Sequence, residues 1–213
     1  MTRLFLIIAL SLILIRGYSQ ADTLTSPTEC DYWNSGITFT LQTGVWTPLG
    51  NLSHTLSSSP SIGLLFGVPI TKRLRFDLGT NIFVPINSNR FSYRLPDTVL
   101  LARPSLVCGV LGLWVTHTDQ IKPKYFFDKI FGLGLGFIQT DKDIPNPQSK
   151  EHTNYSLETM NFSFGFNVRK IVLKRRSIGL NVTYNFTPYS LFQNYVDKDF
   201  GSGSLLTGLI YKF

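Results

Sequence analysis

Apolar and polar positions alternate with a period of two in eight stretches of the chain. Met160, Phe162 and Phe164, for example, are interleaved with Asn161 and Ser163. Because successive side chains of a β-strand point to opposite faces, this pattern predicts strands with one apolar face. The stretches are residues 37–45, 61–70, 74–86, 105–117, 131–137, 160–168, 178–186 and 204–213. Residues 105–117 are apolar on both faces, so their orientation is left open.

The connections between these stretches alternate in length. Long connections rich in Ser, Asn, Asp and Pro are expected at residues 47–60, 87–103, 141–155 and 188–202, and short turns at 71–73, 118–124 and 170–176. Long loops at one rim and short turns at the other are typical of an up-and-down β-barrel. We therefore predict an all-β fold, an eight-stranded antiparallel up-and-down barrel. A soluble sandwich or a lipocalin-like barrel is the alternative, but its connections are not expected to sort by length.

The composition indicates which way the apolar rows face. Charged residues make up 15% of the chain and aromatic residues 14%, which is little charge for a soluble surface. After the N-terminal region no apolar run is long enough for a spanning helix, so membrane insertion would use strands. We expect residues 35–213 to form a transmembrane barrel domain. The aromatic residues expected at its interfacial girdles, each of which could equally be core packing, are Trp46, Trp114, Tyr125, Phe126, Tyr189 and Phe213.

The N-terminus has the layout of a signal peptide. Arg3 precedes an apolar run from Leu4 to Ile15, and small residues follow at Gly17 and Ser19. The run is shorter than the roughly twenty residues of a spanning helix, so a retained anchor is the weaker alternative. We predict a signal peptide at residues 1–19 and a periplasmic N-terminal segment without strand pattern at 20–34. Export followed by barrel formation predicts a location in a Gram-negative outer membrane.

The C-terminus ends on Phe213 with apolar residues at alternate positions, Leu209 and Tyr211. This looks like the terminal signal read by the outer-membrane assembly machinery. Together with residues 44–50, GVWTPLG, which leave the first stretch, it makes the chain similar to small outer-membrane β-barrel families, including PorT-like and OmpX-like proteins. The resemblance implies outer-membrane lipids and the assembly machinery as partners. It also implies, for a PorT-like protein, a part in a secretion or transport assembly.

Four charged residues fall on predicted inward positions, namely Arg75, Asp77, Arg169 and Lys212. An eight-stranded barrel has an interior just wide enough for side chains to fill it. We therefore expect a lumen charge network that rigidifies the barrel, and no general porin role. A narrow ion channel is the alternative.

Basic residues gather at the short turns. The formal net charge of the chain is +7. The expected basic periplasmic rim comprises Lys72, Arg73, Lys170, Lys174, Arg175 and Arg176, with Lys122, Lys124, Lys129 and Arg169 beside it and Asp119 and Asp128 opposing it. Such a rim could attract anionic phospholipid headgroups or an acidic periplasmic or envelope protein, or it could simply be solvated. Nucleic acid is not expected as a partner at this location.

Residues with catalytic or metal-binding potential are sparse. The histidines, His54, His117 and His152, have no spacing typical of zinc sites and no pattern that places a serine beside them. Cys30 and Cys108 are expected not to bridge each other. We predict no catalytic, cofactor-binding or metal-binding residues, and a non-enzymatic structural or accessory component of the cell envelope. The alternative is a lipid-modifying outer-membrane enzyme of the lipid A deacylase or acyltransferase type.

Overall fold

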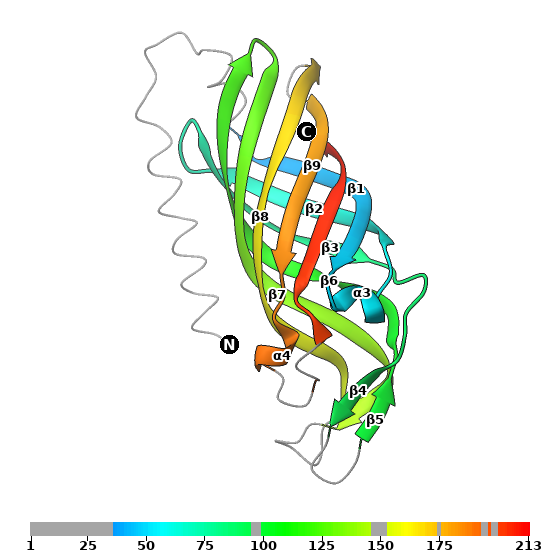
Figure 1. The fold of residues 1–213 in the computed structure, drawn as a ribbon. Coiled ribbons are helices and arrows are strands. Elements are labelled where there is room, and N and C mark those ends of the chain that lie inside the picture. The colour runs from blue at the N-terminus through cyan, green and yellow to red at the C-terminus, as the bar shows by residue number, and fades with distance from the viewer. Residues whose placement is uncertain (1–35, 95–98, 146–152, 174–175, 193–195, 197–199) are drawn as a thin grey trace, which may run out of the picture.

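The wall of the molecule is a closed barrel of eight antiparallel strands (Figure 1). The computed structural model describes residues 36–94, 99–145, 153–173, 176–192, 196 and 200–213. Neighbouring strands follow the order β1-β10-β9-β8-β7-β6-β3-β2, and the pairing of β1 with β10 closes the sheet on itself. The predicted fold class is therefore confirmed. The expected signal peptide and N-terminal segment lie outside the described residues.

The connections between barrel strands are long at one end of the barrel and short at the other. The barrel strands are β1 (Thr38–Leu49), β2 (Ser59–Pro69), β3 (Leu74–Phe83), β6 (Pro104–Lys122), β7 (Tyr125–Pro145), β8 (Thr153–Leu173), β9 (Arg176–Phe186) and β10 (Gly203–Lys212). The long connections carry helix α3 (Leu52–Thr55), the hairpin of β4 (Phe91–Arg94) with β5 (Val99–Ala102), and helix α4 (Tyr189–Phe192). Neither helix is long and apolar enough to cross a membrane. We call the two ends of the barrel the loop end and the turn end.

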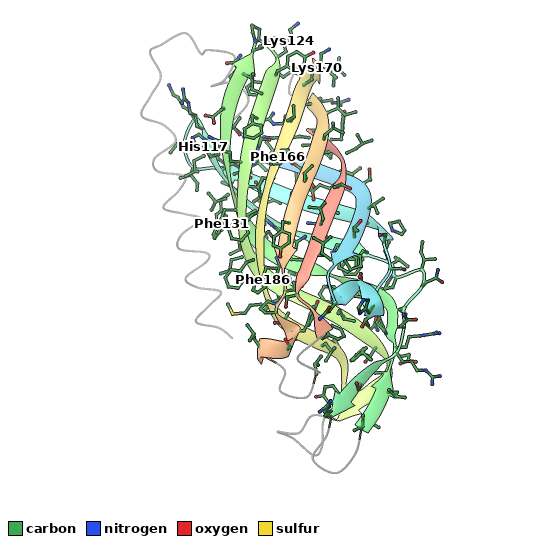
Figure 2. The ribbon with its side chains drawn as sticks, in the orientation of Figure 1. His117, Lys124, Phe131, Phe166, Lys170 and Phe186 are labelled. Atoms are coloured by element: carbon green, nitrogen blue, oxygen red, sulfur yellow. The ribbon has the colours of Figure 1, made fainter. Side chains whose placement is uncertain are left out.

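The outward face of the wall is apolar, as the alternation predicts. Phe131 and Phe166 project from the outer surface of β7 and β8 (Figure 2). In β6, whose orientation the sequence left open, Leu111 and Leu113 point outward while Trp114 points into the barrel. Other exposed apolar side chains on the strands are Phe39, Val45, Ile62, Leu64, Phe76, Leu78, Leu133, Leu135, Met160, Phe164, Val168, Ile178, Leu180, Tyr184 and Leu209.

The strands on one side of the barrel are much longer than expected. β7 and β8 each have 21 residues, about 70 Å at about 3.3 Å per residue, whereas β1, β2 and β3 have 10 to 12. The predicted extent of the turn, residues 118–124, is wrong. β6 runs to Lys122, and only Pro123 and Lys124 separate it from β7. Lys124 has the positive φ of 70° that this tight reversal requires.

Two other predicted connections are also shorter than expected, because their strands are longer. Strands also occupy most of the expected turn at 170–176 and part of the expected loop at 141–155. Beyond the apolar band the outward row becomes charged, as at Asp119 and Lys129, while backbone pairing continues. A pattern built on apolar rows therefore underestimates strand length.

The loop end of the lumen is filled by an apolar core. Trp46 of β1 stacks on Phe83 of β3, with ring centroids 3.9 Å apart and planes 4° from parallel. Residues of the long connections pack in the same cluster as these two rings. The loop-end core consists of Trp46, Leu52, Leu56, Phe83, Phe91, Tyr93, Ala102, Cys108, Ile138, Leu157, Tyr189, Val196, Phe200 and Leu206.

This core corrects the expected aromatic girdles. Trp46 and Tyr189 belong to the loop-end core, and Trp114 and Phe126 are also buried inside the barrel. Only Tyr125 and Phe213 of the expected set are exposed, at the turn end. Aromatic content near a strand end does not reveal which face the ring occupies, because only the parity of the position does.

Closure of the barrel depends on a close approach of two glycines, Gly44 of β1 and Gly208 of β10, which face each other across the strand pair. A Cβ on Gly44 would collide with the carbonyl oxygen of Thr207 and lie 2.7 Å from the Cα of Gly208.

We predict that Gly44→Val destabilises the barrel by about 1–3 kcal/mol through overpacking. Urea unfolding of the refolded protein measures this. The control, Thr43→Val, alters the neighbouring outward position and should match wild type; equal midpoints for both variants would contradict the prediction.

Candidate functional site: the charged lumen and the turn-end rim

Five ionisable side chains meet inside the turn-end half of the barrel. They are Arg75 and Asp77 of β3, Asp128 of β7, Arg169 of β8 and Lys212 of β10, and all five are buried. The four residues expected to form the lumen charge network therefore lie together inside the barrel, joined by Asp128. We call these five residues the lumen cluster.

Arg75 and Asp77 form the first ion pair of the lumen cluster. They lie two residues apart on one strand, so they share the inward face. The Nε of Arg75 donates to the Oδ1 of Asp77 at 2.6 Å, and the Oγ1 of Thr116 donates to the Oδ2 at 2.7 Å. Both oxygens of this carboxylate therefore have partners.

Arg169 and Asp128 form the second pair, across the contact of β7 with β8. Arg169 donates from Nε to Oδ2 of Asp128 at 2.7 Å and from Nη2 to Oδ1 at 3.1 Å, the two-pronged geometry typical of guanidinium with carboxylate. Thr118 donates to the same Oδ1 at 2.7 Å. The Arg169 guanidinium also lies 4.8 Å from the ring centroid of Phe126. Guanidinium, carboxylate and ring form one compact unit.

Asp128 and Arg169 both lie inside the barrel and not at the basic rim. Asp128 was expected to oppose the basic rim, and Arg169 was assigned both to that rim and to the lumen; both residues lie inside. A usable signal existed for Asp128. It shares parity with Gly132 and Gly134, which alternate with the apolar row of Phe131 and Leu133, so extending that strand by four residues places the carboxylate in the lumen.

Amide and hydroxyl side chains fill the middle of the lumen. Asn161 donates to Ser163 at 2.7 Å, and Ser163 donates to Asn185 at 2.8 Å. Asn181 donates to Asn167 at 2.6 Å. A cavity of about 20 Å³ remains between this layer and the lumen cluster. From the loop end to the turn end, the interior is thus apolar, then neutral polar, then charged.

The turn end carries the exposed basic residues. Lys72 and Arg73 lie on the turn between β2 and β3, and Lys170 and Arg176 lie on β8 and β9; all four are exposed. The Nζ of Lys170 lies 5.4 Å from the ring centroid of Tyr125. Lys124 and Lys170 mark this end in Figure 2. Lys174 and Arg175, which complete the expected rim, lie outside the described residues.

The C-terminal residues lie on the outward face beside the start of β1. Leu209, Tyr211 and Phe213 share one parity, and Leu209 and Phe213 are both about half exposed. The backbone of Phe213 exchanges hydrogen bonds of 2.9 and 2.8 Å with that of Phe39. The expected assembly signal therefore sits at the seam that closes the barrel.

The described histidines, His54 and His117, and the described cysteine lie apart from the lumen cluster. His54 is exposed on α3, and His152 and Cys30 lie outside the described residues. His117 faces outward, with its Nδ1 3.6 Å from Asp119, which also pairs with Lys129 at 2.9 Å. Cys108 is buried in the loop-end core as a free thiol. Within the described part of the chain, no three His, Cys, Asp or Glu side chains are grouped as a metal site requires.

Comparison with known proteins shows the fold of the chain. No protein-family model and no curated protein sequence matches it. Among solved structures, Neisserial surface protein A superposes with a TM-score of 0.57 at 11% identity, covering 82% of this chain and 95% of that one. The N-terminal β-barrel domain of Pseudomonas aeruginosa OprF and the attachment invasion locus protein Ail of Yersinia pestis match with TM-scores of 0.43 and 0.42, at 8% and 10% identity. Each match covers 83% of this chain and nearly all of the other, at 97% and 96%.

The pair of Asp128 with Arg169 generates a stability prediction. Asp128→Asn leaves the buried guanidinium without its counter-charge, so we expect a loss of about 3–5 kcal/mol of unfolding free energy. The double variant Asp128→Leu with Arg169→Met removes both charges and should recover most of that loss. Asp119→Asn, which breaks an exposed pair with Lys129, should change little because solvent screens it. Urea unfolding followed by tryptophan fluorescence distinguishes these outcomes, and an undamaged Asp128→Asn barrel would refute the assignment.

Proposed function

We propose that the chain is an outer-membrane protein of a Gram-negative bacterium and acts as a non-enzymatic structural or accessory component of the cell envelope. The observation that carries the proposal is the inverted polarity of the barrel. Apolar side chains cover the outside, and asparagines, threonines and ion pairs fill the inside. In water this arrangement exposes a large apolar surface, whereas in a bilayer it places each face in its favourable environment.

The interior supports a structural role. Side chains occupy the described lumen at three levels, from the loop-end core to the lumen cluster. Eight-stranded walls leave room for side chains rather than for a diffusing solute. The loop-end core also fixes the loops that carry α3, α4 and the β4–β5 hairpin against the mouth of the barrel. A firmly held surface at the loop end suits a protein that presents a contact surface to its surroundings.

The proposal predicts co-fractionation with outer membranes and a change of gel mobility on boiling. The unboiled protein should migrate as a compact barrel in detergent, and the boiled protein at the position of its chain length. Planar bilayers containing the purified protein should show no stepwise currents, since the lumen is filled. Recovery of the mature chain as a soluble monomer without detergent would overturn the location, and regular conductance steps would favour the narrow channel instead.

The accessory part of the proposal rests on the turn end. In outer-membrane barrels the short turns face the periplasm. Exposed Lys72, Arg73, Lys170 and Arg176 would there meet anionic headgroups or an acidic envelope protein. The resemblance of the C-terminal residues and of residues 44–50 to PorT-like proteins makes a secretion or transport assembly the specific version of this proposal.

A charge-matched pair of variants tests the accessory role by crosslinking in cells. The turn-end variant carries Lys72→Gln, Arg73→Gln and Arg176→Gln, and the loop-end control carries Arg90→Gln, Arg94→Gln and Arg103→Gln. We expect the turn-end variant alone to lose crosslinked envelope proteins, and the wild-type yield to fall with salt because exposed charges are screened. An identical set of crosslinked proteins in both variants and wild type would refute the partner.

A further inference from the structure

One row of outward side chains crosses four neighbouring strands at the turn end. Tyr125 of β7 stands opposite Lys170 of β8, and Lys170 stands opposite Ile178 of β9. Tyr211 of β10 continues the row beside Ile178. Lys170 is the charged member of this row, and its Nζ lies 5.4 Å from the ring centroid of Tyr125. A cation thus lies between aromatic and apolar side chains on the outside of the wall, near the end of β8 (Figure 2).

The next outward row toward the loop end is apolar on the same four strands. Phe127 stands opposite Val168, and Leu180 lies between Val168 and Leu209. The side chains of these residues, which we call the apolar row, are exposed or half-buried on the outer face. The ring of Phe127 also stacks on that of Phe166, with centroids 5.7 Å apart. The lysine therefore marks the border of the apolar outer surface.

Lys170 has no carboxylate partner among the residues that the structure describes. Asp119, an outward carboxylate of β6, pairs with Lys129 at 2.9 Å. Asp128 of β7 lies inside the barrel and pairs with Arg169. Within this part of the chain, the positive charge of Lys170 is thus left for an external anion.

A second cation lies beside Lys170. Arg176 of β9 is exposed and shares the outward parity of Ile178, which stands opposite Lys170. Such diagonal neighbours on adjacent antiparallel strands lie about 7–8 Å apart at their Cα atoms, so two long side chains can reach one phosphate. Arg176 also has no carboxylate partner in the described ranges. Two cations at the edge of an apolar surface match a ligand with an anionic head and apolar chains.

We propose that the outer face of β7, β8 and β9 binds one anionic phospholipid of the periplasmic leaflet, with its phosphate at Lys170 and Arg176 and its acyl chains along the apolar row. The inference rests on the proposed outer-membrane location, in which the turn end faces the periplasm. The hydroxyls of Tyr125 and Tyr211 are further donors for the phosphate oxygens. An acidic protein would match the two cations but would leave the apolar row unused, whereas a phospholipid matches both.

The test places the refolded protein in nanodiscs that contain phosphatidylcholine and phosphatidylglycerol in equal amounts. Native mass spectrometry of the released protein should show retained lipid enriched in phosphatidylglycerol. Excess glycerol 3-phosphate, which has the phosphate without the chains, should not displace that lipid; displacement would assign the site to free phosphate. An unboiled gel sample shows first that the barrel is folded. A folded wild-type barrel without enrichment overturns this inference and leaves the proposed location intact.

Three variants connect the enrichment to the site. Lys170→Gln should lower it about fivefold, the effect of one basic residue at an anionic surface, and Lys170→Arg, which keeps the charge, should retain it. Lys72→Gln makes the same change of charge at the turn between β2 and β3, on the far side of the barrel, and should match wild type. Equal losses in Lys72→Gln and Lys170→Gln would reduce the effect to a general attraction of the rim. Unchanged enrichment in Lys170→Gln, with a crosslinked envelope protein lost instead, would assign this flank to a protein; either result overturns the site.

Discussion

The pairing of β1 with β10 turns a row of hairpins into a closed wall, and the other features of the molecule depend on it. Closure gives every barrel strand a hydrogen-bonded neighbour on each side, as strands that cross hydrocarbon require. It also fixes the register of every strand. A slip of one residue would exchange the inward and outward rows, moving Lys212 into the position of Tyr211 or Phe213. Apolar surface, ion pairs and loop-end core are all consequences of this one register.

The interior has a gradient of polarity along the barrel axis. At the loop end, stacked Trp46 and Phe83 join the loops to the wall through apolar contact. At the turn end, Arg169 and Asp128 join β7 to β8 through charge. The first kind of contact tolerates variation in the loops that pack onto it, while the second requires particular partners at particular distances. The loop end can therefore vary in sequence more freely than the turn end without loss of the fold.

Alternation of apolar residues was enough to predict the barrel, because parity alone decides which face a side chain occupies. Met160, Phe162 and Phe164 face outward as expected. The same parity would have placed Trp46 inside, but its aromatic character and position near a strand end suggested a girdle instead. For Trp114 parity gave no answer, because residues 105–117 are apolar on both faces. The pairing of Asp128 with Arg169 joins residues 41 positions apart and needed the register between β7 and β8, which no local pattern contains.

The unequal height of the wall gives the barrel two different flanks. A strand needs about 9–11 residues to cross a bilayer, which β1, β2 and β3 provide with little to spare, whereas β7 and β8 have about twice that length. In the proposed outer-membrane location, the short flank would end close to the lipid headgroups, and the tall flank would extend beyond them into water. A neighbouring molecule approaching there in the plane of the membrane would meet apolar side chains alone on one flank and an additional water-exposed stretch of strand on the other. Lateral contacts of such a barrel would therefore be directional.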